Sequence, residues 1–426
     1  MTANTTDETL AIHGGKPAKQ HPAPPMYPGG NLIDEEEEAQ VLEVLRTRRL
    51  FRYYGPVDGP SKVDQLEEEF AAHMGTRRAL AVTSGTAALI CGLRGIGVGP
   101  GDEVIIPAYT WIASASAVLA VGAVPVVAEI DDSLTLDPAD AEAKISPYTK
   151  AIMPVHMRGT PCQMDAIMGL ARRYDLKVIE DSAQADGASY KGRRTGSIGD
   201  VGCFSLQFNK ILTSGEGGMV ITNDEEVWKR ALMFHDVVGG MRNNFSWDET
   251  LWGINFRMPE LLGAVMLVQL RRLEGLLTAM RERKRMLIEG TRETAQRKGV
   301  RFQQVPDPDG DASVACILLM PDAESAARTA GALRAENIGA GVLYHPERID
   351  YHIYAHWVPI MAQRAWSANG SPWSLAQRDI HYSKEMCQRS LDLLGRAVHL
   401  DVNPLESNSD MEETIEGINK VLEAVV

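Results

Sequence analysis

The sequence predicts an α/β protein with a mainly parallel central sheet, and three observations support this prediction. Short apolar segments alternate with helical patterns between residues 79 and 181, which is typical of a parallel sheet covered by helices on both faces. The 426 residues exceed what one compact core usually holds, so we expect two domains. A content of 44% hydrophobic and 23% charged residues is ordinary for a globular protein.

The N-terminal part begins with a polar segment rich in proline and glycine, residues 1–30, which we expect to form an irregular arm. A helix is then expected over residues 63–74, because its apolar residues recur at helical spacing and Gly75 is a typical helix stop. The expected strands follow at residues 79–82, 103–107, 124–130, 151–155, 177–181, 201–206 and 218–222.

The C-terminal part begins with a long helical pattern from Pro259 to about Arg297, which could join two domains. A smaller α+β unit is expected after it, with strands at 312–321 and 340–345 and helices at 325–339 and 411–425. Residues 346–385 are rich in His, Trp and Tyr without periodicity, so we expect a binding loop there. The predicted organisation is an arm (1–30), a large domain (31–290) and a small C-terminal domain (291–426).

Composition argues against several classes of partner. A formal charge of −14 and a pI near 5.3 disfavour binding to nucleic acid or to anionic membranes. We see neither a signal peptide at the start nor an apolar run of the roughly 20 residues needed to cross a bilayer. The five cysteines are scattered without a C-x-x-C pair, and no histidines have metal-ligand spacing. We therefore expect a soluble cytoplasmic protein without a metal site.

The first motif that could carry chemistry is Ser84-Gly85-Thr86, where an expected strand ends and a helix begins. The unpaired N–H groups and the dipole at a helix N-terminus favour an anion, and the hydroxyl groups add hydrogen-bond donors. The alternative is an ordinary helix cap, because Ser and Thr are common at that position. The motif alone does not decide between a phosphate site and a cap.

The second motif is the acidic pair Glu180 and Asp181 at the end of an apolar strand. Ligands of parallel α/β sheets bind at the carboxyl ends of the strands. A poorly solvated carboxylate at that edge favours a cationic partner. The alternative is an acid that caps a helix or stabilises a turn.

The third motif is the segment SLQFNKILTSGEGG, residues 205–218, which contains the single cation Lys210. A lysine here could bind phosphate, act as a Schiff-base nucleophile, or be a solvated loop charge. The glycines at 215, 217 and 218 require tight backbone geometry. The segment is not a P-loop, because the lysine precedes the glycines.

Together the three motifs match the requirements of pyridoxal 5'-phosphate. Its phosphate needs a helix N-terminus, its pyridine nitrogen needs an acid that keeps it protonated, and its aldehyde needs a lysine. Ser84-Gly85-Thr86, Asp181 and Lys210 provide these groups in order along an α/β framework. The combination favours a cofactor site over three unrelated structural roles.

The sequence also resembles a known family, the DegT/StrS-type aminotransferases, over roughly residues 30–345. The resemblance lies in several spaced segments: SGTAAL, GDEVIIPAYTWIASASAV, GAVPVVAEID, IEDSAQADGASYKGRRTGSIGDVGCFS, NK-x-x-TSGEGG and GINFRMPELLGAVMLVQL. These enzymes have the fold-type I architecture, a three-layer large domain with a smaller C-terminal α+β domain. They use pyridoxal phosphate to aminate keto-sugars and cyclitols.

The resemblance implies roles for the residues in these motifs. Lys210 would form the Schiff base and move the proton, Asp181 would pair with the pyridinium nitrogen, and Gln184 would hydrogen-bond the ring hydroxyl. Trp111 matches the family's aromatic residue that stacks on the cofactor ring, although a tryptophan there could also belong to the core or to an interface. The residues that would hold the phosphate are Ser84, Gly85, Thr86 and Ser205.

The resemblance further implies a homodimer with shared active sites, because Asn255 matches a residue that reaches the phosphate of a neighbouring subunit. The implied reaction moves an amino group from glutamate or glutamine to a keto-sugar or keto-cyclitol, in amino-sugar, aminocyclitol or antibiotic biosynthesis. Lysine at position 210 argues for transamination, because family members with histidine there dehydrate sugars instead.

Some features depart from the family pattern and leave the substrate open. Gln207-Phe208 stands where the family often has F-H-P, and a glutamine near this position resembles the cyclitol and aminobenzoate branches. His156, His345 and Gln207 are candidate substrate residues, although either histidine could instead have a structural role. Two rival functions are a pyridoxal-phosphate lyase or dehydratase on the same scaffold and a non-catalytic regulatory homologue. The keto substrate, its linkage to a nucleotide and the choice of donor stay open.

Overall fold

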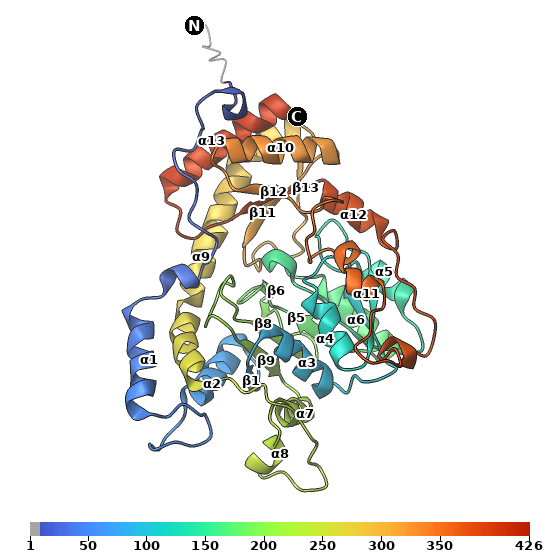
Figure 1. Cartoon of the computed structure of the whole chain (residues 1–426). Coiled ribbons are helices and arrows are strands. Elements are labelled where there is room, and N and C mark those ends of the chain that lie inside the picture. The colour runs from blue at the N-terminus through green and yellow to red at the C-terminus, as the bar shows by residue number, and fades with distance from the viewer. Residues whose placement is uncertain (1–8) are drawn as a thin grey trace, which may run out of the picture.

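The computed structural model describes residues 9–426, and its largest feature is a seven-stranded sheet with the strand order β1-β9-β8-β5-β4-β2-β3 (Figure 1). The five strands from β3 to β8 pair in parallel, whereas β9 is antiparallel to both β8 and β1. The sheet is therefore mainly parallel, as predicted. Its strands are β1 (Arg78–Val82), β2 (Glu103–Pro107), β3 (Val124–Ala128), β4 (Thr149–Ile152), β5 (Lys177–Asp181), β8 (Val201–Ser205) and β9 (Gly218–Thr222).

Helices cover both faces of this sheet, because alternate side chains of its strands enter different hydrophobic clusters. Leu80 and Val82 of β1 pack in the cluster with the helices α3, α4 and α7, whereas Ala79 and Ala81 pack in the cluster with α2 and α9. The result is the three-layer arrangement expected for the large domain. The helices around this sheet are α2 (Lys62–Met74), α3 (Gly85–Gly95), α4 (Ala113–Ala120), α5 (Pro138–Lys144), α6 (Met164–Tyr174), α7 (Glu225–His235), α8 (Gly239–Arg242) and α9 (Glu260–Arg297).

Local signals explain where these helices begin and end. Ser61 starts α2 with a capping box in which its side chain accepts from the Asp64 amide, and Gly75 ends it with φ of 68°. Ser84 caps α3 by accepting from the Ala87 amide at 3.0 Å. The predicted helix stop at Gly75 is confirmed.

A second sheet, with the order β10-β11-β13-β12, forms the C-terminal part and is antiparallel throughout. The long helix α9 contacts α2, which covers the first sheet, and β11 in the second sheet. Its span contains residue 290, where the sequence analysis placed the domain boundary. The elements after α9 are β10 (Arg301–Phe302), β11 (Ala315–Leu319), α10 (Ala323–Ala335), β12 (Ala340–Val342), α11 (Val358–Met361), α12 (Gln388–Gly395), β13 (Ala397–Asp401) and α13 (Asn408–Val425). A separate two-stranded sheet is formed by β6 (Ser189–Tyr190) and β7 (Arg193–Arg194).

The described part of the N-terminal arm packs on the C-terminal part of the chain, which we call the second unit. The amides of Ala11 and Ala18 both donate to the Glu336 carboxylate at the end of α10, at 2.8 and 2.7 Å. Lys19 pairs with Glu406, and both side chains are buried. The arm is irregular apart from short 3₁₀ turns, as predicted for residues 9–30, while residues 1–8 lie outside the described residues.

Several elements were absent from the sequence analysis, among them α1 and β13. The helix α1 (Glu35–Thr47) begins with a capping box between Asp34 and Glu37, but it lacks a wide apolar face, so its periodicity is weak. Strand β13 is short and lies between two helices, and it pairs with β11 and β12. Strands β3 and β4 also end earlier than predicted, at Ala128 and Ile152.

Residues 346–385 return from the second unit to the carboxyl ends of the first sheet. The His352 carbonyl accepts from the Thr110 amide at 2.9 Å, and Ile353 forms an isolated bridge with Tyr109 just after β2. Tyr354 and Trp357 are fully buried and fix this segment in the main core. The segment therefore places side chains from the C-terminal half beside the residues that follow β2. Within residues 9–426, no helix has the length and apolar character needed to cross a membrane.

Candidate active site

A pocket of about 440 Å³ lies where the carboxyl ends of β5 and β8 meet the start of α3. Parallel strands end at the same edge of a sheet, so residues distant in sequence meet there. His352 from the returning segment also lines the pocket. Nine of the predicted site residues lie in its lining: Ser84, Gly85, Thr86, Trp111, Asp181, Gln184, Ser205, Gln207 and Lys210.

The start of α3 lies very close to the end of β8. A Cβ atom added to Gly85 would stand 2.6 Å from the Cβ of Ser205, so only glycine fits at this position without displacement. The first N–H groups of a helix have no partners within the helix, and together with the Ser205 hydroxyl they can hold an anion. This end of the pocket suits a phosphate group.

Asp181 ends β5 and is only 4% exposed. Its Oδ2 accepts a hydrogen bond from the Ser114 hydroxyl at 2.7 Å, and its Oδ1 accepts from the Ala183 amide at 3.1 Å. Burial raises the pKa of this carboxyl group, while the two hydrogen bonds and the positive charge of Lys210 act in the opposite direction. The carboxylate is held in one orientation and favours a cationic partner in the pocket.

Lys210 stands in a tight turn that follows β8. The turn is closed by main-chain hydrogen bonds, including Leu206 N to Gly217 O at 2.9 Å and Phe208 N to Gly215 O at 3.1 Å. Gly215 and Gly217 have φ of 85° and 155°, which confirms the expected need for glycine. Within residues 9–426 the Lys210 amine has no hydrogen-bond partner, and burial lowers its pKa. A desolvated amine of this kind is suited to act as a nucleophile or base.

A chain of hydrogen bonds fixes Gln184 in the lining of the pocket. Its Oε1 accepts from the Arg158 main-chain amide at 3.2 Å, so its amide nitrogen faces Nε2 of His352 at 3.3 Å. His352 Nε2 is therefore the acceptor, and its Nδ1 donates to Asp350 Oδ1 at 2.7 Å. Burial also lowers the pKa of His352, which agrees with a neutral ring.

Three predicted residues lie outside the pocket lining. His156 is fully buried, where its Nδ1 accepts from the Cys162 amide and its Nε2 donates to Glu180 at 3.0 Å. His345 is exposed in a turn closed by a bridge to Arg348. Asn255 is exposed on the segment before α9, and its Oδ1 accepts from the Arg257 amide. Their proposed roles stay predictions.

Several residues at the site were missed by the sequence analysis: Ser114, Arg158, Asp186 and His352. His352 belongs to the segment 346–385, which was predicted as a binding loop, but the sequence did not indicate which of its histidines would reach the pocket. Ser114 and Asp186 lie inside segments that carry the family resemblance, but the sequence did not single them out, because their importance depends on what they contact in the fold.

Comparison with known proteins agrees with this geometry. Residues 31–372 match the DegT/DnrJ/EryC1/StrS aminotransferase family. The chain belongs to this family. It is 34% identical over 412 residues to the spore coat polysaccharide biosynthesis protein SpsC of Bacillus subtilis, covering 92% of this chain and 95% of that protein. It is 41% identical over 278 residues to the L-glutamine:2-deoxy-scyllo-inosose aminotransferase of Streptoalloteichus tenebrarius, covering 62% of this chain and 64% of that protein.

Solved structures give the same result. The crystal structure of 3-amino-5-hydroxybenzoic acid synthase superposes with a TM-score of 0.78 at 28% identity, covering 95% of this chain and all of that one. The aminotransferase DesV of S. venezuelae superposes with a TM-score of 0.75 at 30% identity, covering 92% of this chain and 95% of that one. The protein is thus an aminotransferase of the DegT/StrS family, with the fold that the sequence predicted.

Aminotransferases of this family depend on pyridoxal 5'-phosphate, and the residues of the pocket fit that group. The pocket offers the helix start at Gly85 for the phosphate, the buried Asp181 for the ring nitrogen, and the amine of Lys210 for the aldehyde. Trp111 is 46% exposed at the pocket and lies 4.9 Å from the His352 ring, measured between centroids.

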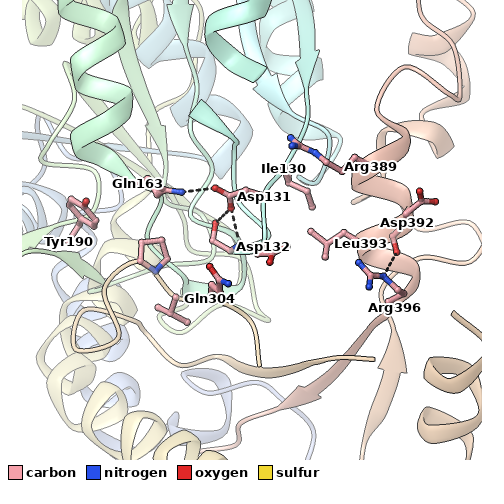
Figure 2. A pocket seen from close by; sticks show the side chains of 13 residues that line it. Ile130, Asp131, Asp132, Gln163, Tyr190, Gln304, Arg389, Asp392, Leu393 and Arg396 are labelled. Atoms are coloured by element: carbon pink, nitrogen blue, oxygen red, sulfur yellow. Dashed lines mark hydrogen bonds between the residues drawn. The ribbon is translucent and has the colours of Figure 1, made fainter. Parts of the chain in front are cut away.

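A larger pocket of about 690 Å³ lies elsewhere, between the segment after β3 and α12 (Figure 2). Some of its polar groups already have partners, since Gln163 donates to Asp131 at 2.6 Å and Arg389 pairs with Asp137. It contains none of the predicted cofactor residues. The chemistry of the side chains, and not the size of the pocket, therefore identifies the site at Lys210.

Proposed function

We propose that this aminotransferase moves an amino group from glutamate or glutamine to the ketone of a sugar or cyclitol, in amino-sugar or aminocyclitol biosynthesis. The observation that carries this proposal is that the Lys210 amine and the Asp181 carboxylate line one pocket with the start of α3. Lys210 provides the nucleophile, and Asp181 provides the charge that a protonated pyridine ring needs.

The chemistry divides between the cofactor and the chain. Bound pyridoxal phosphate supplies a carbonyl group that condenses with amines and a ring that accepts the electron pair left by proton removal. Lys210 takes the proton from the donor carbon and returns it, because its lowered pKa favours the neutral amine that a base requires. Asp181, oriented by Ser114, holds the proton at the ring nitrogen. Gln184 would donate from its amide nitrogen to the ring hydroxyl.

Relatives support the substrate class. The similar proteins include an L-glutamine:2-deoxy-scyllo-inosose aminotransferase and a dTDP-3-amino-3,4,6-trideoxy-alpha-D-glucose transaminase of Streptomyces venezuelae, the latter 42% identical over 241 residues. The alignments with these two cover 64% and 61% of those proteins. Gln207, which lines the pocket beside Lys210, is the chain's own feature that favours the cyclitol branch.

The test is a single turnover of the purified protein loaded with pyridoxal phosphate. Glutamate or glutamine should convert the cofactor to pyridoxamine phosphate, and a ketone such as scyllo-inosose should convert it back. Lys210→Ala should lose the absorbance band of the bound cofactor and this conversion. Release of ammonia or water from the substrate without pyridoxamine phosphate would instead indicate a lyase or dehydratase, and no conversion with any ketone would indicate a regulatory homologue.

We further propose a homodimer with shared active sites. The segment that includes α8 and leads to Asn255 exposes large apolar side chains, with Trp247 at 78% and Trp252 at 75% exposure. Exposed aromatic side chains in such a group are typical of a surface that binds another protein. Asn255 is exposed beside them, as expected for a residue that serves a neighbouring subunit.

Mixing two inactive variants tests the sharing. Lys210→Ala and Asn255→Ala would each be impaired as pure proteins. If the Asn255 side chain serves the neighbouring subunit, a mixed dimer contains one complete site, and activity returns on mixing after subunit exchange. If both residues serve the same chain, mixing restores nothing, and sedimentation velocity on the same samples reports separately whether a dimer forms.

A further inference from the structure

Asp186 is a buried acid near the site, and the mechanism described above gives it no role. It stands in the segment after β5, two residues beyond the pocket residue Gln184, and its side chain is fully buried. Within residues 9–426, neither of its carboxylate oxygens has a hydrogen-bond partner. An acid is rarely buried without a partner, because taking its charge out of water is costly. The fold thus keeps a carboxyl group where an apolar side chain of similar size would cost less.

The Asp186 side chain borders the turn that carries Lys210 from the protein interior. Asp186 does not line the pocket, and its neighbour Ala185 packs in one hydrophobic cluster with Ile211 and Leu212 of that turn. The Leu212 main-chain amide faces the Asp186 carboxyl group and lowers its pKa, although the contact lacks the geometry of a hydrogen bond. The carboxyl group therefore lies against the main chain two residues beyond the lysine.

The charges of Asp186 and Lys210 act on each other. Burial raises the pKa of Asp186 to about 8, and the positive charge of Lys210 opposes this rise. Burial lowers the pKa of Lys210, and the negative charge of Asp186 opposes that fall more strongly than the charge of Asp181 does. Arg158 lowers the pKa of Lys210, and the neutral His352 ring also lies within reach of the lysine charge. Each ionised member of the pair favours ionisation of the other.

We propose that Asp186 is a positioning residue for Lys210, whose carboxylate stabilises the ammonium group that forms when the amine takes a proton. The inference rests on the proposed role of Lys210 as the base. In that step the lone pair of Nζ forms an N–H bond, the C–H bond of the donor carbon breaks, and its electron pair passes to the cofactor ring. A positive charge thus appears in a buried place, and an ionised carboxylate behind it offsets the cost.

The test measures the Lys210 amine in the cofactor-free protein, so that it does not depend on turnover. Asp186→Asn and Asp186→Leu remove the charge and keep a side chain of similar size, and the exposed Asp248→Asn is the control. Each protein is treated briefly with acetic anhydride at pH values between about 7 and 11, around the ordinary pKa of a lysine. Only the neutral amine reacts, so the acetylation of Lys210, quantified by peptide mass spectrometry, gives its pKa.

We expect both Asp186 variants to lower the pKa of Lys210 by about one unit or more, the usual effect of removing an opposite charge at short range. Asp248→Asn should leave this pKa unchanged. Single turnovers of the loaded protein give a second measurement. The rate constant for forming pyridoxamine phosphate should fall about threefold or more in both variants at high pH, because an amine with a lower pKa is a weaker base.

An unchanged Lys210 pKa in both variants would overturn the inference, and slower turnover without that change would give Asp186 a purely structural role. Circular dichroism shows first which variants are folded, and if only one of them folds, the pKa measured in that variant decides. If the pKa falls as expected but the wild-type protein forms no pyridoxamine phosphate from glutamate or glutamine, the proposed function fails while the charge coupling stands. The two failures are therefore distinguishable.

Discussion

The hydroxyl group of Ser114 lies 2.7 Å from Oδ2 of Asp181, and both side chains are buried. Ser114 also shares a hydrogen bond of 2.6 Å with Thr110, so a short relay holds the carboxylate from behind. Asp181 is thus oriented by a residue on α4 that comes from a different crossover of the sheet.

Removing that hydroxyl should weaken the action of Asp181 on the cofactor. We expect Ser114→Ala to lower the turnover number about tenfold or more, because a hydrogen bond to a buried charged group is worth roughly 1.5–3 kcal/mol. Steady-state kinetics of the loaded enzyme checks this. Thr110→Val, which keeps the Ser114–Asp181 contact, is the matched control, and an equal or greater loss in that variant would contradict the assignment.

Asp186 should make the stability of the protein fall as the pH rises. It is fully buried, neither of its carboxylate oxygens has a partner within residues 9–426, and burial raises its pKa to about 8. Between the unfolded value of 3.8 and this pKa, the folded state holds a proton that the unfolded state has lost. The free energy of unfolding then falls by about 1.4 kcal/mol for each pH unit in this window, and it stops falling above the folded pKa.

Urea unfolding of the cofactor-free protein at several pH values between 6 and 9 measures this effect. We expect Asp186→Asn to remove the decrease of the free energy of unfolding with rising pH. The difference in this free energy between the variant and the wild-type protein should therefore change in favour of the variant as the pH rises to about 8. The exposed Asp248→Asn is the control, and it should leave the slope as it is in the wild-type protein. Parallel curves for wild type and Asp186→Asn would disprove the assignment.

His235 should make the stability of the protein fall as the pH is lowered. This buried ring donates from Nδ1 to the Leu232 carbonyl at 2.6 Å, and burial lowers its pKa to about 4. Its contribution to the free energy of unfolding is present above the unfolded pKa of 6.5. This contribution is lost as the pH falls towards 4, by about 3 kcal/mol in total. His235→Asn should flatten this part of the stability curve, whereas the exposed His381→Asn should not.

Gly85 should be intolerant of a side chain. We expect Gly85→Ala to reduce pyridoxal phosphate affinity and to lower the free energy of unfolding by about 1–3 kcal/mol, because the new methyl group would overlap Ser205. Gly169→Ala is the control, because its added Cβ meets no atom within 4 Å and alanine favours the interior of α6. Cofactor titration and urea unfolding measure both effects. Normal affinity in Gly85→Ala would contradict the close approach.

The sequence was sufficient to predict the parts of the fold and site that depend on local signals. The alternation of strands and helices predicted the mainly parallel sheet, and the Gly75 stop was found where it was expected. The motifs around Gly85, Asp181 and Lys210 could be found because each lies at or shortly after the end of a strand, and a parallel sheet brings such positions together.

The remainder depended on contacts between distant segments. His352 reaches the pocket because residues 346–385 fold back over the end of β2, and no periodicity in that segment indicates this path. The hydrogen bonds of Arg158 to Gln184 and Tyr109 became evident only in the fold, since an arginine in a sequence gives no sign of which side chains lie beside it. His156 also follows a strand, yet it turns inward to Glu180, because its main-chain position alone does not fix its side chain.

The helix α9 has a mechanical consequence for how substrates enter. Its 38 residues form a rod about 57 Å long that packs on elements of both sheets. Rotating one sheet against the other would require bending this rod and breaking its packing along the way. We therefore expect the pocket to open and close through the loops that line it, among them the segment with His352, and not through rotation of one sheet against the other.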